Sequence, residues 1–134
     1  MTKKTFLFNK LIRDLSYERI MQESISYKAI PCNDTQRIKH LKDKLQEEAV
    51  EVVEACNEAD LKEELADVLE VVHGFAHAMG LSFEDIEKER LKKLQVRGGF
   101  KKSAFIHSVT FDANHPLTHY CLDRPTKYPE IKED

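Results

Sequence analysis

The amino-acid sequence predicts an all-α protein in which a few helices form a small bundle. Apolar residues recur at three- and four-residue steps through the middle of the chain, 34% of the residues are charged, and tryptophan is absent. This composition suits helices with long solvated faces. A chain of 134 residues with 41% hydrophobic residues has material for one core. We expect one helical domain over residues 1–111 and a C-terminal tail over residues 112–134.

The N-terminal part of the chain contains one short predicted helix. Residues 6–14 lead into this helix, which runs from about residue 15 to residue 23. Residues 28–33 contain Pro31 and are predicted to form a connection, because proline disfavours helical backbone in the residue before it.

The first long helix is predicted to begin at Asn33 or Asp34, since either side chain can cap it. Its apolar residues recur at three- and four-residue steps, at Ile38, Leu41, Leu45, Val52 and Ala55. Glu48 completes this stripe between Leu45 and Val52. A carboxylate therefore occupies a position where the pattern requires a core residue.

The second long helix follows a short break at residues 57–60. We expect Asp60 to cap it, with Glu63 as the reciprocal partner, and we expect it to end near Met79, just before Gly80. Its apolar residues cover most of its circumference, so it should be buried on several sides. One small chain offers too little cover for such a helix, and we therefore expect a homodimer or a homotetramer.

A third helix is predicted from Ser82 to about Gln95, and two glycines at residues 98–99 stop it. Ser82 is a good cap, and acidic residues follow it where the helix dipole favours them. Residues 104–111 have the β-branched and aromatic content of a strand. We expect a short strand or an irregular tail there, and loop in the remainder.

Two acidic pairs are the most informative feature of the chain. Glu48 and Glu51 form one pair and Glu64 and Asp67 the other, each with the spacing that places side chains on one helical face. If the two helices fold back on each other, four carboxylates meet and repel unless a cation holds them. Ligands that are all oxygen suit Mg²⁺, or Mn²⁺, better than zinc.

Other interpretations of these residues stay open. Each acidic pair taken alone fits a solvated helix face, and the chain fits a non-catalytic oligomerisation or interaction protein with a structural metal. Glu70 and His73 form half of a di-iron motif whose second half a dimer can supply, and His73 with His77 fits a two-ligand zinc face. Two histidines in one helix are, however, more often packed or hydrogen-bonded.

Apolar run length, net charge and cysteine spacing indicate the location and partners that we expect for the chain. No apolar run reaches the roughly 18 residues of a membrane span, and no secretory signal follows the first residues, so we expect a cytosolic protein without membrane contact. A net charge of −3 disfavours nucleic acid as a partner. The three cysteines share no metal-ligand or redox spacing and are expected to be reduced.

Four stretches together resemble a known group of enzymes. The acidic motifs lie in residues 45–52 and 64–70, Asn-Lys-Leu-Ile-Arg-Asp occupies residues 9–14, and Lys-x-x-x-Arg-Gly-Gly-Phe occupies residues 93–100. The chain is similar in these stretches to the small single-domain members of the MazG-type all-α nucleoside triphosphate pyrophosphohydrolases. That superfamily includes phosphoribosyl-ATP pyrophosphohydrolases and dimeric dUTPases. The resemblance departs at residues 15–17, Leu-Ser-Tyr, where Lys and Ile-Pro are typical, and after Phe111.

The resemblance implies a Mg²⁺-dependent enzyme that converts a nucleotide to its monophosphate and pyrophosphate, in nucleotide-pool house-cleaning, histidine biosynthesis or dUTP removal. Glu48, Glu51, Glu64 and Asp67 would be the metal ligands. Glu47 would activate water or support the metal ligands. The phosphates would be bound by basic residues, namely Lys10, Arg13, Lys93 and Arg97.

Overall fold

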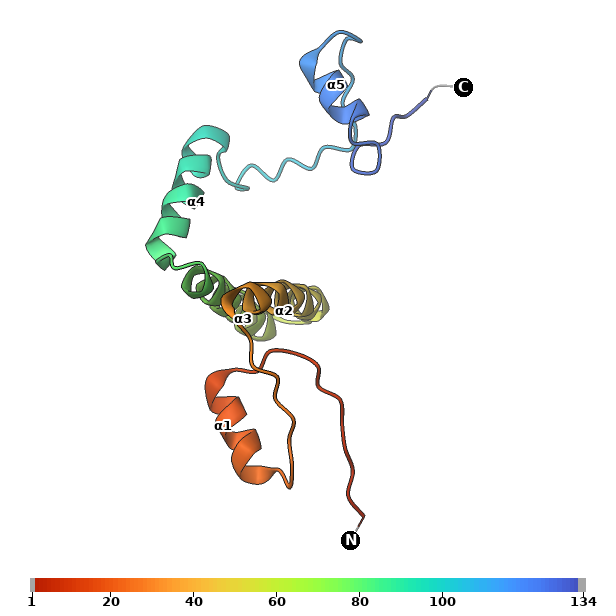
Figure 1. Ribbon diagram of the computed structural model, residues 1–134. Helices are drawn as coiled ribbons and strands as arrows, with labels where there is room; N and C mark the ends of the chain where they lie inside the picture. The colour runs from red at the N-terminus through yellow and green to blue at the C-terminus, as the bar shows by residue number, and fades with distance from the viewer. Residues whose placement is uncertain (1, 133–134) are drawn as a thin grey trace. The chain divides into compact units, whose positions relative to one another are not determined.

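The protein is all-helical over residues 2–132, which are the residues that the computed structural model describes (Figure 1). This confirms the predicted fold class. The helices are α1 (Asp14–Glu23), α2 (Asp34–Glu54), α3 (Glu58–Ala78), α4 (Phe83–Arg97) and α5 (Pro116–Leu122). The chain divides into two compact units, one ending at Arg97 and the next beginning at Gly98. The domain boundary expected between residues 111 and 112 stays a prediction.

Helices α2 and α3 form an antiparallel hairpin and lie side by side (Figure 1). At the open end of the hairpin, Arg37 Nη1 on α2 lies 3.3 Å from His77 Nδ1 on α3. In the middle, a Cβ added at Gly74 would lie 3.0 Å from Leu41 Cδ2, so glycine permits close packing of the helices there. The turn at residues 55–57 then brings the C-terminal half of α2 against the N-terminal half of α3.

Side-chain caps fix where the two long helices begin. At α2, Asn33 Oδ1 accepts from the Gln36 backbone N–H and the Gln36 side chain accepts from the Asn33 N–H, both at 2.9 Å. At α3, Asn57 Oδ1 accepts from the Asp60 N–H at 2.9 Å. The prediction that Asp60 caps α3 is therefore wrong. Asp60 is the third residue of the helix, and its Oδ2 accepts a hydrogen bond from the side-chain Nδ2 of Asn57.

The core of this unit is small. Leu41, Val71 and Ala78 are buried together, and three half-buried residues pack against them, Leu11, Ile38 and Phe75. Within one chain helix α3 is covered only in part, and the expectation that it is buried on several sides once copies assemble stays a prediction. Its outer face presents three leucines at four-residue steps that are 38%, 47% and 53% exposed, Leu61, Leu65 and Leu69. The reason is that α2 and α4 cover only part of the helix.

Helix α4 begins and ends close to the predicted positions. The Ser82 N–H donates to Asp85 Oδ2 at 2.9 Å, and the Asp85 N–H donates to Ser82 Oγ at 3.3 Å, which makes a reciprocal cap. Gly80 before the helix and Gly98 after it have φ of 69° and 75°, values at which side chains with a Cβ are strained.

The C-terminal unit differs from the sequence-based expectation in two places. Residues 103–112 form no strand, because no other strand is present in the described chain to pair with them. The expected irregular tail is thus found for this segment. Helix α5 was expected to be loop. Pro116 occupies its first turn and the His115 side chain accepts from the Leu117 N–H at 3.1 Å, so both stabilise its start.

No helix within residues 2–132 is long and apolar enough to cross a lipid bilayer.

Candidate metal centre

Four carboxylates meet between α2 and α3, close to the turn that joins the helices. Glu48 and Glu51 come from α2, and Glu64 and Asp67 come from α3. One oxygen from each lies within 4.8 Å of those from the other three. The three-residue spacing puts each pair on one face, and the antiparallel hairpin makes those faces meet. The structure therefore brings together all four residues that the sequence predicts as metal ligands.

The carboxylates of this cluster are incompletely satisfied. Glu48 is only 6% exposed, and its Oε2 and the Glu64 Oε2 are buried without a hydrogen-bond partner. Burial raises the pKa of Glu48, and a hydrogen bond and repulsion from Glu51 raise it further, while Lys44 opposes the rise. Buried acceptors without donors are costly. A cation would satisfy them, and a set of four oxygens suits Mg²⁺ or Mn²⁺.

An opening gives solvent access to the cluster. A hollow of about 230 Å³ beside the α2–α3 turn is lined by Glu51, Glu54, Ala55, Asp60 and Glu64. Two of the four clustered carboxylates therefore face a space that a solvated ion or an anionic group held by that ion can enter.

The segment before α1 carries two basic side chains to this region. Arg13 Nη2 lies 3.3 Å from Asp67 Oδ1, and Lys10 Nζ lies 3.0 Å from Glu47 Oε1. Both cations are more than 40% exposed and can reach an incoming anion. The structure thus places two of the four predicted phosphate-binding residues beside the acidic cluster.

Glu47 is paired with two lysines rather than free. Besides Lys10, Lys44 Nζ lies 3.3 Å from both Glu47 oxygens. The hydrogen bond from Lys10 lowers the pKa of Glu47, burial raises it somewhat, and Lys44 lowers it further. Lys44 Nζ also lies 3.5 Å from Glu48 Oε1, so it links Glu47 to the acidic cluster.

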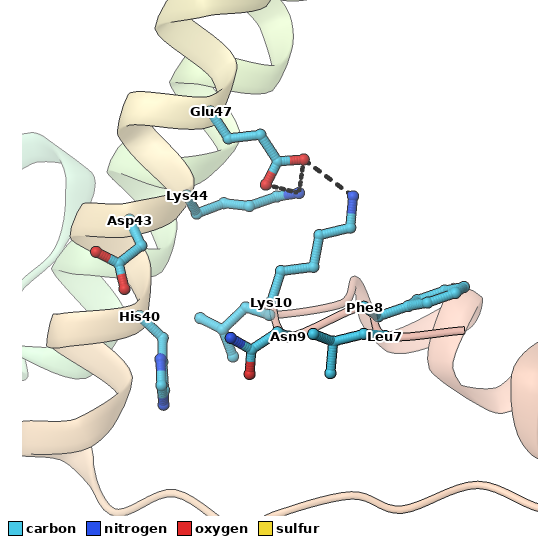
Figure 2. A pocket seen from close by; sticks show the side chains of 9 residues that line it. Leu7, Phe8, Asn9, Lys10, His40, Asp43, Lys44 and Glu47 are labelled. Carbon is cyan, nitrogen blue, oxygen red and sulfur yellow. Dashed lines mark hydrogen bonds and ion pairs between the residues drawn. The ribbon is translucent and has the colours of Figure 1, made fainter. Parts of the chain in front are cut away.

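An open pocket of about 460 Å³ lies next to Glu47, between the segment before α1 and one face of α2 (Figure 2). Its lining residues are Leu7, Phe8, Asn9, Lys10, Leu11, His40, Asp43, Lys44 and Glu47. Most of these residues belong to no motif that the sequence predicts as functional. The spacing of His40, Lys44 and Glu47, which puts them on one face of α2, was the available clue.

The chain matches the phosphoribosyl-ATP pyrophosphohydrolase family over residues 9–93. It belongs to this family. The matched range contains the segment with Lys10 and Arg13 and both acidic pairs, so it covers the candidate metal centre in full. No curated protein and no solved structure matches the chain.

Membership in the phosphoribosyl-ATP pyrophosphohydrolase family, which is MazG-like, defines the class of reaction. The chain is a pyrophosphohydrolase, an enzyme that acts on the acid anhydride of a nucleotide. Members typically depend on a divalent metal, and the cluster of four carboxylates in this chain is consistent with that dependence.

Two predicted phosphate-binding residues of this family member lie elsewhere. Lys93 and Arg97 are exposed on the last turns of α4, and neither forms an ion pair with a described carboxylate of the cluster. Lys93 is the last residue of the family match, and Arg97 lies beyond it.

The two histidines of the competing metal motif are engaged in other contacts. The His73 ring stacks on Phe83 with centroids 4.2 Å apart, and His77 contacts Arg37. Within the described residues, the group of metal-binding side chains that the structure gathers is the four carboxylates, and it does not include Glu70, His73 or His77.

Proposed function

We propose that this chain hydrolyses a nucleoside triphosphate, or a related nucleotide such as phosphoribosyl-ATP, to the monophosphate and pyrophosphate with the help of Mg²⁺. Mn²⁺ is the alternative ion. The observation that carries the proposal is the cluster of Glu48, Glu51, Glu64 and Asp67, whose oxygens lie within 4.8 Å of one another. Two of these carboxylates have buried, unpartnered oxygens that a hard cation would satisfy. Nucleotide-pool house-cleaning is the physiological role that we favour.

The residues around the cluster supply the other requirements of the reaction. When bound, Mg²⁺ would neutralise charge on the phosphates and help to activate water. Arg13 pairs with Asp67 in the free protein, and its planar guanidinium group can turn to donate two hydrogen bonds to a phosphate. A phosphate that draws Lys10 away leaves Glu47 Oε1 with Lys44 as its one cation, at 3.3 Å, so that oxygen has a lone pair with which to accept a proton from the attacking water. We assign these roles to Arg13, Lys10 and Glu47.

We further propose that two or four copies of the chain assemble. The buried core of one copy is small, and α3 leaves a row of leucines partly exposed. Assembly would cover that row. It also offers Lys93 and Arg97 a route to the phosphates bound by a neighbouring copy, since these residues do not reach the cluster in their own chain. A cytosolic location and the absence of a nucleic-acid partner are part of the same proposal.

The decisive experiment is a substrate panel of NTPs, dNTPs and phosphoribosyl-ATP, scored for release of pyrophosphate with and without Mg²⁺. We expect turnover of at least one member that EDTA abolishes. Glu64→Ala and Asp67→Ala should lower kcat by about 100-fold or more with the helical circular dichroism retained, because each removes a metal ligand. Glu63→Gln, at an exposed position on the same helix, is the matched control.

Two results would contradict the proposal. Absence of turnover across the whole panel would remove the enzymatic function. Unfolding of the Glu64→Ala and Asp67→Ala variants, with the control intact, would indicate a structural metal site in a non-catalytic helical protein.

A further inference from the structure

The pocket beside Glu47 has the size and position of a ligand site. Its volume of about 460 Å³ falls within the roughly 300–1,000 Å³ of small-molecule sites. Figure 2 shows that Lys44 and Glu47 reach from α2 toward Lys10, and the pocket is also lined by His40 and Asp43, which lie nearer the start of that helix. The pocket therefore has one wall of helix and one wall of extended chain.

The charges in the pocket disfavour a phosphate group. Its two lysines are balanced by two carboxylates, those of Asp43 and Glu47. Both lysines also contact Glu47, Lys10 at 3.0 Å and Lys44 at 3.3 Å. A triphosphate lying in the pocket would have to separate both lysines from Glu47 and would find no net positive charge there, whereas a phosphate at the neighbouring acidic cluster needs only Lys10 to leave Glu47. An uncharged group with hydrogen-bonding edges suits the pocket better.

The remaining lining groups fit such a ligand. The side chains of Asn9, His40 and Asp43 form no hydrogen bond with another described residue, so they offer free donors and acceptors. An ionised Asp43 can only accept, and it therefore selects a ligand with an N–H or O–H group. Phe8 is 57% exposed and supplies an aromatic face on which a planar ring can stack.

The pocket adjoins the candidate metal centre. Glu47 directly precedes Glu48 in the chain, and Lys44 Nζ lies 3.3 Å from Glu47 and 3.5 Å from Glu48. A molecule whose phosphates lie at the four carboxylates can therefore extend its uncharged part into the pocket. We propose that this pocket binds the nucleoside part of the substrate, with Phe8 stacking on the base and Asp43 accepting from its donors. This proposal rests on the proposed function and deepens it.

Binding and turnover in the full-length protein test the proposal separately. The probes are AMP, GMP, CMP, UMP and their 2′-deoxy forms, titrated without metal by calorimetry, and inorganic triphosphate, titrated with Mg²⁺. Phe8→Ala and Asp43→Asn should each weaken the best-bound monophosphate by about tenfold, the effect of one stacking or hydrogen-bonding contact. Affinity for inorganic triphosphate should stay unchanged. In steady-state turnover, both variants should raise KM for the nucleotide with the preferred base, while kcat stays within about threefold of the wild-type value.

Matched controls are Phe6→Ala, which removes an aromatic ring outside the pocket, and Asp34→Asn, which lies nine residues before Asp43 and hence on the opposite face of α2. Both should behave as the wild type. If the deoxy forms bind as well as the ribose forms, Asp43 contacts the base, and the proposal stands in its stated form.

Three outcomes would overturn the pocket assignment. The first is failure of the wild type to bind any monophosphate. The second is an unchanged affinity for the monophosphate in both Phe8→Ala and Asp43→Asn. The third is a loss of affinity for inorganic triphosphate in these variants that equals their loss for the monophosphate. The proposed function can fail independently. If no nucleotide is hydrolysed but Asp43→Asn still weakens monophosphate binding, the pocket assignment holds and the catalytic one does not.

Discussion

Arg13 and Asp67 form an ion pair, with 3.3 Å between Arg13 Nη2 and Asp67 Oδ1, that ties the segment before α1 to the acidic cluster. Asp67 is also a proposed ligand of Mg²⁺. Arg13 and the cation therefore compete for one carboxylate when no phosphate is present. When a nucleotide binds, the same arginine becomes a phosphate ligand. Arg13 should therefore lower the affinity of the protein for Mg²⁺ alone and raise its affinity for the substrate.

Replacing Arg13 by glutamine tests this competition. Arg13→Gln should strengthen binding of Mg²⁺ in the absence of nucleotide by up to about fivefold, the range of an exposed ion pair. It should also raise KM by about tenfold, because a charge-assisted phosphate contact is lost. Calorimetric titration with Mg²⁺ and steady-state kinetics measure the two effects. Arg19→Gln, on an exposed position of α1, should change neither. Weaker binding in both assays would contradict the assignment.

Glu48 should stabilise the metal-bound protein and destabilise the metal-free protein. Its Oε2 is buried without a partner, and repulsion from Glu51 and Asp67 adds to the cost of burial in raising its pKa. Glu48→Gln should therefore stabilise the metal-free fold by about 1 kcal/mol, since a neutral amide replaces a poorly satisfied charge. It should also abolish the rise in Tm on addition of Mg²⁺.

Thermal unfolding in EDTA and in MgCl₂ measures both effects of Glu48→Gln. Glu63→Gln serves as the control, because Glu63 is exposed and is not one of the four clustered carboxylates. A lower Tm of Glu48→Gln in EDTA would show that Glu48 is well satisfied without metal, contrary to our assignment.

The acidic cluster was predictable because it depends only on helical periodicity. Glu64 and Asp67 share a face at three-residue spacing, and a short turn between two helices forces that face against the one with Glu48. The cap of α3 was less predictable. Asn57 and Asp60 both have cap-forming side chains, and the structure uses Asn57 as the cap and Asp60 as its partner. Sequence preference alone does not choose between them.

The features that the sequence did not reveal depend on contacts distant in the chain. The pocket requires the segment before α1 to lie against α2, which brings Lys10 Nζ to 3.0 Å from Glu47 Oε1, 37 residues away in the chain. No local pattern encodes that path. Residues 104–111 illustrate the opposite error, since their strand-forming composition has no effect without a partner strand.

The leucine row of α3 should be needed for assembly and not for the fold of one copy. Leu65 lies at its centre and is 47% exposed, so Leu65→Asp removes little packing within the chain. Buried at a contact between copies, however, an unpaired aspartate would be strongly unfavourable. We expect Leu65→Asp to reduce the mass measured by sedimentation equilibrium to that of one copy and to leave the helical content unchanged. Leu15→Asp on α1, which is 77% exposed, is the control. An unchanged mass would place the contact elsewhere.

The start of α4 should become less stable in acid because of Asp85. Hydrogen bonds from the Ser82 backbone N–H and then from its hydroxyl lower the pKa of Asp85 below its ordinary value of 3.8. A carboxylate whose pKa is lower in the folded state stabilises that state above the unfolded pKa, and the contribution is lost as the pH falls through the folded pKa. The loss should therefore begin below about pH 3.8. Carboxyl NMR titration should give Asp85 a lower pKa than the same residue in a peptide of residues 80–88. Amide exchange in the first turn of α4 should accelerate over the same pH range, and Asp85→Asn should remove this pH dependence. An Asp85 pKa equal to that in the peptide would contradict the reciprocal cap with Ser82.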